Sequence, residues 1–70
     1  MNKYRIIIFK EFHLIPETFI ITSTDYLEVI REKINESLNG NALCFTDIKN
    51  KVRFYDRNVI TKIFIKTIGE

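Results

Sequence analysis

The chain has almost none of the residues that cross-link small domains. Its 70 residues include one cysteine, Cys44, and one histidine, His13. A single cysteine excludes a disulfide within the chain, and one cysteine with one histidine is too few for a Cys/His zinc site. A domain of this size is only marginally stable without such a cross-link. Self-association is the remaining source of stability that the composition suggests.

Long apolar runs are also missing. No segment approaches the roughly 18 apolar residues of a membrane-spanning helix. The apolar run that ends at Phe9 is interrupted by Lys10 and Glu11, and no small-residue cleavage site follows it, so a signal peptide is not expected. Together with the single cysteine, these absences predict a cytoplasmic protein that does not contact a membrane.

Signatures of catalysis are missing as well. The chain has two glycines, Gly40 and Gly69, so it has no glycine-rich phosphate loop. His13 lies in a predicted turn, where a plain surface histidine is expected, and Cys44 is expected to be a small buried hydrophobic residue. We therefore predict no enzyme, no cofactor and no metal, and we name no catalytic residue.

What the chain does have is strands that are apolar on both faces. Residues 5–9 and 59–65 place large apolar side chains at both odd and even positions. Because successive strand residues point to opposite faces of a sheet, such runs need cover on both sides. One helix covers only one face, which leaves the other to a second copy, a partner or a ligand.

One helix is predicted near the middle of the chain. An apolar stripe at spacings of +3, +4 and +4 is formed by Leu27, Ile30, Ile34 and Leu38. Thr24 or Asp25 is placed to cap the first turn. Residues 39–41 end the helix, with Gly40 suited to a left-handed position after it.

Five strands are predicted around this helix, at residues 3–10, 18–22, 42–46, 51–55 and 59–67. The first two form a hairpin with Pro16 in its turn. The last three form a meander whose turns are residues 47–50 and 56–58. The order ββαβββ predicts one α+β domain over residues 1–70, with a mainly antiparallel sheet of four to five strands and the helix packed on one face.

The predicted core combines the helical stripe with one face of the sheet. In the first strand, Ile6 and Ile8 compete with Ile7 and Phe9 for that face, and the sequence does not decide between the two pairs. The sheet residues expected in the core are Phe19, Ile21, Leu43, Phe45, Val52, Phe54, Ile63 and Ile65.

Basic and aromatic residues alternate on the opposite face of the predicted last hairpin. Cations bind phosphates and aromatic rings stack on bases, so such a face suits single-stranded nucleic acid. The favoured interpretation is a solvated face whose long lysine stems cover apolar neighbours, or a protein interface. The candidate residues for either role are Lys51, Arg53, Tyr55, Lys62, Phe64 and Lys66.

The charge is modest and unevenly spread. Residues 1–39 carry five basic and six acidic side chains, a net of −1, and residues 40–70 carry six basic and three acidic ones, a net of +3. Strong nucleic-acid binders are usually more basic. The sequence therefore favours a non-catalytic protein-interaction module that self-associates through its sheet, most simply as a homodimer. Its isoleucine-rich composition suggests a phage or mobile-element inhibitor of a host protein. The alternative is a single-stranded nucleic-acid-binding module that uses the last hairpin.

Overall fold

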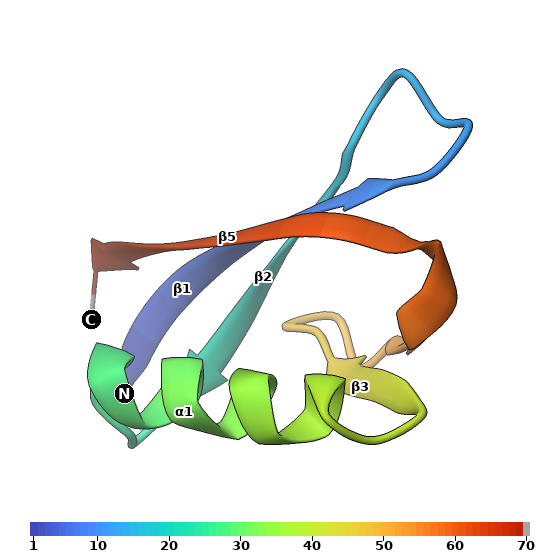
Figure 1. The fold of residues 1–70 in the computed structure, drawn as a ribbon. Helices are drawn as coiled ribbons and strands as arrows, with labels where there is room; N and C mark the ends of the chain where they lie inside the picture. Colours follow the sequence, from blue (N-terminus) through green and yellow to red (C-terminus); the bar gives the residue numbers. More distant parts are fainter. Residues whose placement is uncertain (70) are drawn as a thin grey trace.

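The computed structural model describes residues 1–69, so the last residue of the predicted domain lies outside the described part. The prediction of an α+β fold with five strands and one helix is confirmed, and every strand pair is antiparallel (Figure 1). The elements are β1 (Asn2–Lys10), β2 (Glu17–Ser23), α1 (Leu27–Leu38), β3 (Ala42–Thr46), β4 (Val52–Asp56), a 3-10 turn η1 (Arg57–Val59) and β5 (Ile60–Gly69).

The predicted hairpin of β1 and β2 is confirmed, and its register settles which face of β1 is buried. Ile6 lies opposite Phe19, so both point to the same face of the sheet. Tyr4, Ile6 and Ile8 are at most 2% exposed. The odd-numbered residues Ile7 and Phe9 therefore lie on the other face, where they are only partly buried.

Helix α1 forms where its apolar stripe predicted it, but it is capped differently. Ile30 and Ile34 are buried, while Leu27 and Leu38 pack at the margin of the core. The N-cap position is Tyr26, which makes no side-chain cap hydrogen bond, so neither Thr24 nor Asp25 caps the helix as predicted. The carboxylate of Asp25 instead pairs with Lys33 at 2.6 Å. The cap after the helix is Asn39 in a right-handed conformation, so no left-handed glycine is needed there.

The predicted meander of the last three strands is wrong, because β5 leaves β4 and pairs with β1. The strands form a three-stranded sheet in the order β2-β1-β5 and a separate two-stranded sheet of β3 and β4. Turn η1 redirects the chain, with the Asp56 side chain accepting from the N–H of Asn58. Pairing with β1 places Ile63 opposite Ile8 and completes the hydrogen bonding of the central strand.

The register of β3 and β4 also differs from the prediction. Thr46 pairs with Val52, so the connecting loop has five residues, 47–51, where four were predicted. One extra residue turns β4 over, because strand side chains alternate between faces. Val52 and Phe54, both predicted in the core, are 63% and 68% exposed, whereas Tyr55 is buried.

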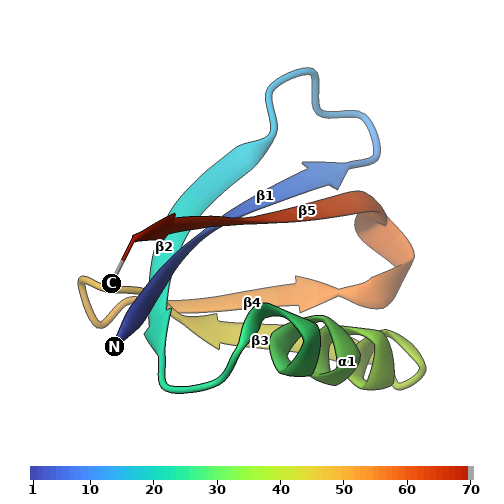
Figure 2. The ribbon, with the colours of Figure 1, turned by 90° about the vertical axis from the view of Figure 1, so that its left-hand side faces the viewer.

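The core lies between the three-stranded sheet and a second layer made of α1 and the β3–β4 hairpin (Figure 2). Both parts of the second layer lie on the same side of the sheet. The opposite side, which we call the outer face, is covered by no element within residues 1–69. The buried members of the core are Tyr4, Ile6, Ile8, Phe19, Ile21, Ile30, Ile34, Leu43 and Tyr55.

Candidate functional site

The six candidate residues from the sequence do not share one face. Lys62, Phe64 and Lys66 alternate along β5 and are exposed on the outer face of the three-stranded sheet. Lys51 lies in the loop before β4, and Arg53 and Tyr55 point inward. The assumed β4–β5 hairpin is the cause of this error, since it placed the residues of two unpaired strands side by side.

Pairing of β5 with β1 gives the outer face a different set of neighbours. Lys66 lies opposite Arg5, and Lys62 lies opposite Phe9. Side chains of directly opposed residues lie on the same face, about 5 Å apart. The outer face is therefore built from three strands, and its members are Lys3, Arg5, Ile7, Phe9, Thr18, Ile20, Thr22, Lys62, Phe64 and Lys66.

The outer face carries four cations and, among residues 1–69, no carboxylate. Two phenylalanines lie among these cations. The rings of Phe9 and Phe64 meet edge to face, with centroids 5.7 Å apart and an interplanar angle of 84°. The ammonium of Lys62 lies 5.2 Å from the centre of the Phe64 ring. Phe64 is 49% exposed, so part of its ring is open to a ligand.

Arg53 and Tyr55 belong to a polar cluster that joins β4 to the β1–β2 hairpin. Glu17 Oε1 accepts hydrogen bonds from the Arg53 guanidinium and the Tyr55 hydroxyl, each at 3.0 Å, and Oε2 accepts from Lys10 Nζ at 2.6 Å. The hydrogen bond from Lys10 is the main reason that the pKa of Glu17 lies below its ordinary value. Burial, with the Glu17 charge beside it, raises the pKa of Tyr55 to about 12. These groups tie β4 to the β1–β2 hairpin.

Asp47 continues this cluster at the start of the β3–β4 loop. Its Oδ1 accepts from the backbone N–H groups of Lys49 and Lys51, and its Oδ2 accepts from Arg53 Nε at 3.1 Å. Burial alone would raise the pKa of Asp47, but these hydrogen bonds outweigh it and lower the pKa. Both carboxylate oxygens of Asp47 therefore already accept hydrogen bonds. Asp47 also lies near Arg5, at the β2 edge of the sheet.

The sequence missed Lys3, Arg5 and Phe9 as members of the candidate site. These residues alternate in the first strand, which is visible in the sequence. They form a site only together with Lys62 and Phe64 of β5. That pairing joins residues more than fifty positions apart. No local pattern reports it.

His13 and Cys44 are both exposed. His13 is exposed in the β1–β2 loop, where its Nδ1 lies 2.8 Å from the backbone oxygen of Glu11. Cys44, expected to be buried, is exposed, because it shares the outward side of the β3–β4 hairpin with Phe54.

No helix within residues 1–69 is long and apolar enough to cross a membrane. Over the same range, no three His, Cys, Asp or Glu side chains are grouped so as to hold a metal ion.

Comparison with protein-family models, curated proteins and solved structures finds no match for this chain. The candidate site is therefore defined by its own geometry: a three-stranded sheet face with four cations and two phenylalanine rings.

Proposed function

We propose that the chain is a non-catalytic module that binds single-stranded nucleic acid on the outer face. The observation that carries this proposal is the composition of the face, where cations alternate with apolar and aromatic side chains and, within residues 1–69, no carboxylate is a member of the face. Cations hold the phosphates, while exposed rings stack on the bases without regard to sequence. The modest net charge of +2 does not weaken the argument, because the positive charge is concentrated where the ligand would lie.

The same charge pattern disfavours a dimer formed through the outer face. A twofold dimer sets a surface against its own copy, so Lys3, Arg5, Lys62 and Lys66 of one chain would meet those of the other. Like charges brought together at an interface cost several kcal/mol. A polyanion gains from the same four cations, which is why we rank it above self-association at this face.

A non-catalytic role is supported by the state of the polar groups. The carboxylate of Glu17 is occupied by three donors, and His13 lies in an exposed loop where no carboxylate of residues 1–69 is among its hydrogen-bond partners. A general base needs a free lone pair beside a bound substrate. Neither group offers that arrangement.

Fluorescence anisotropy with a labelled oligothymidylate of roughly ten nucleotides, within the range of single-domain site sizes, tests the proposal. With four phosphate contacts, the logarithm of affinity should fall with the logarithm of salt concentration at a slope of about −3. Lys66→Ala should make this slope shallower by about 0.7. Phe64→Ala should weaken binding by about 1–3 kcal/mol, through loss of stacking, and leave the slope unchanged.

Two exposed residues outside the outer face provide matched controls. Lys51→Ala and Phe54→Ala remove the same chemical groups from the β3–β4 hairpin, and both should bind like the unmodified chain. Absent or salt-insensitive binding would contradict the proposal. Equal losses for Lys51→Ala and Lys66→Ala would contradict the assignment of the site to this face.

A further inference from the structure

The loop between β1 and β2 exposes apolar side chains to an unusual degree. Phe12 and Leu14 are fully exposed and Ile15 is 83% exposed. The backbone of Phe12 has a φ of 63°, a left-handed conformation that is unfavourable for a bulky residue. Figures 1 and 2 show this loop extending beyond the end of the sheet. We call residues 11–15 the hairpin tip; nothing within residues 1–69 covers it.

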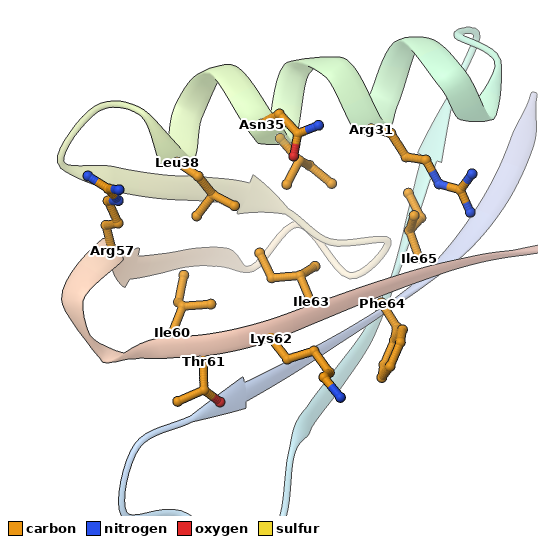
Figure 3. Close-up of a pocket in the computed structure, with 11 residues that line it drawn as sticks. Arg31, Asn35, Leu38, Arg57, Ile60, Thr61, Lys62, Ile63, Phe64 and Ile65 are labelled. Atoms are coloured by element: carbon orange, nitrogen blue, oxygen red, sulfur yellow. The ribbon is translucent and has the colours of Figure 1, made fainter.

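A groove of about 480 Å³ lies between α1 and β5 (Figure 3). This volume falls in the range of concave ligand sites, about 300–1,000 Å³. Its floor is apolar, and Asn35 extends into it from the helix. Arg31 and Arg57 stand at its ends, and neither forms an ion pair within residues 1–69. The apolar side chains of the floor are Ile34, Leu38, Ile60, Ile63 and Ile65.

We propose that the hairpin tip of one copy docks in the α1–β5 groove of another copy of this chain. The tip supplies Phe12, Leu14 and Ile15 for the apolar floor. Its one carboxylate, Glu11, is exposed and would meet Arg31 and Arg57 in a groove that has no carboxylate in its lining within residues 1–69. The match is thus both apolar and electrostatic. A chain does not fill its own groove, because the tip points away from α1 in both views.

This contact joins two different surfaces, the hairpin tip of one copy and the groove of another. Two such contacts related by a twofold axis give a closed dimer, and a single contact that repeats gives a longer assembly. The groove lining includes Lys62 and Phe64 at the margin of the outer face, whereas Lys3, Arg5, Phe9 and Lys66 lie outside it, so either arrangement leaves most of the outer face free. Self-association through the tip is therefore compatible with the proposed binding of nucleic acid. Each of the two proposals can be contradicted without affecting the other.

Size-exclusion chromatography with light scattering on the unmodified chain and three variants tests this inference. The unmodified chain should exceed the 8.4 kDa of a monomer at high micromolar concentration. Phe12→Ser/Leu14→Ser removes the tip, and Asn35→Trp fills the groove; each should be monomeric. A mixture of these two variants should associate again at millimolar concentration, because one contributes an intact tip and the other an intact groove.

Glu32→Trp, on an exposed helix position outside the groove lining, is the control and should associate like the unmodified chain.

Circular dichroism and urea unfolding establish that each variant is folded, and Arg57→Glu replaces Asn35→Trp if the tryptophan disturbs the helix. An unmodified chain that remains at 8.4 kDa would overturn the inference, and binding of that monomer to neutral lipid vesicles would assign the tip to a membrane instead. Association that survives in either variant, or a mixture that stays monomeric, would also overturn it. Binding of a short oligonucleotide by the tip variant tests the outer face independently.

Discussion

The charge of Glu17 supports the fold, because this carboxylate accepts hydrogen bonds from both β1 and β4. Its folded pKa is lowered from 4.5, mainly by Lys10. A carboxyl group with a lowered pKa adds stability above its unfolded pKa and loses that contribution as the pH falls through its folded value. The free energy of unfolding should therefore decrease from about pH 5 downward, and urea titrations over this range measure it.

Glu17→Gln should be less stable at neutral pH and should lose less stability on acidification than the unmodified chain. Asp47, whose pKa is also lowered, keeps part of the dependence in this variant. Glu28→Gln, at an exposed helix position, is the matched control and should follow the unmodified profile. An identical acid profile for Glu17→Gln and the unmodified chain would contradict a role for this carboxylate.

At the scale of the element, the β3–β4 hairpin offers a direct test of its register. The five-residue loop buries Tyr55 and exposes Phe54, whereas a four-residue loop would reverse them. Phe54→Ser should change the free energy of unfolding by about 0.5 kcal/mol or less. Tyr55→Ala should cost about 3 kcal/mol, because it leaves a cavity in the core. Urea denaturation of both variants measures the difference, and the reverse order would favour the register predicted from sequence.

Elements held by local interactions could be predicted from the sequence, and those set by distant partners could not. The apolar stripe from Leu27 to Leu38 is a local signal, and it located α1. The β3–β4 register depends on one extra loop residue, which Asn50 accommodates with a φ of 62° while Asp47 bonds the loop backbone. No pattern of apolar residues in the sequence indicates this extra loop residue.

At the scale of the whole molecule, the partner of β5 decides where the candidate site lies. Ile63 and Ile65 were predicted in the core and do pack there, partly buried. That parity placed Lys62, Phe64 and Lys66 on the opposite face correctly. The sequence could not show that their neighbours come from β1, because antiparallel pairing across more than fifty residues leaves no local trace. Half of the site was therefore predictable, and the half supplied by Lys3, Arg5 and Phe9 was not.

The two proposals together predict one property of the assembled protein, its avidity for long nucleic-acid strands. If copies associate through tip and groove, neighbouring outer faces can hold one strand together, and each added contact becomes intramolecular. The unmodified chain should then bind a strand of roughly sixty nucleotides, several times the site size of one domain, at least tenfold more tightly per site than one of roughly ten. Phe12→Ser/Leu14→Ser should lose that gain and keep its affinity for the short strand, because the tip lies outside the outer face. Anisotropy titrations with both lengths measure this. Equal losses on both lengths would mean that the tip itself contacts nucleic acid, and an undiminished gain in the variant would separate avidity from self-association through the tip.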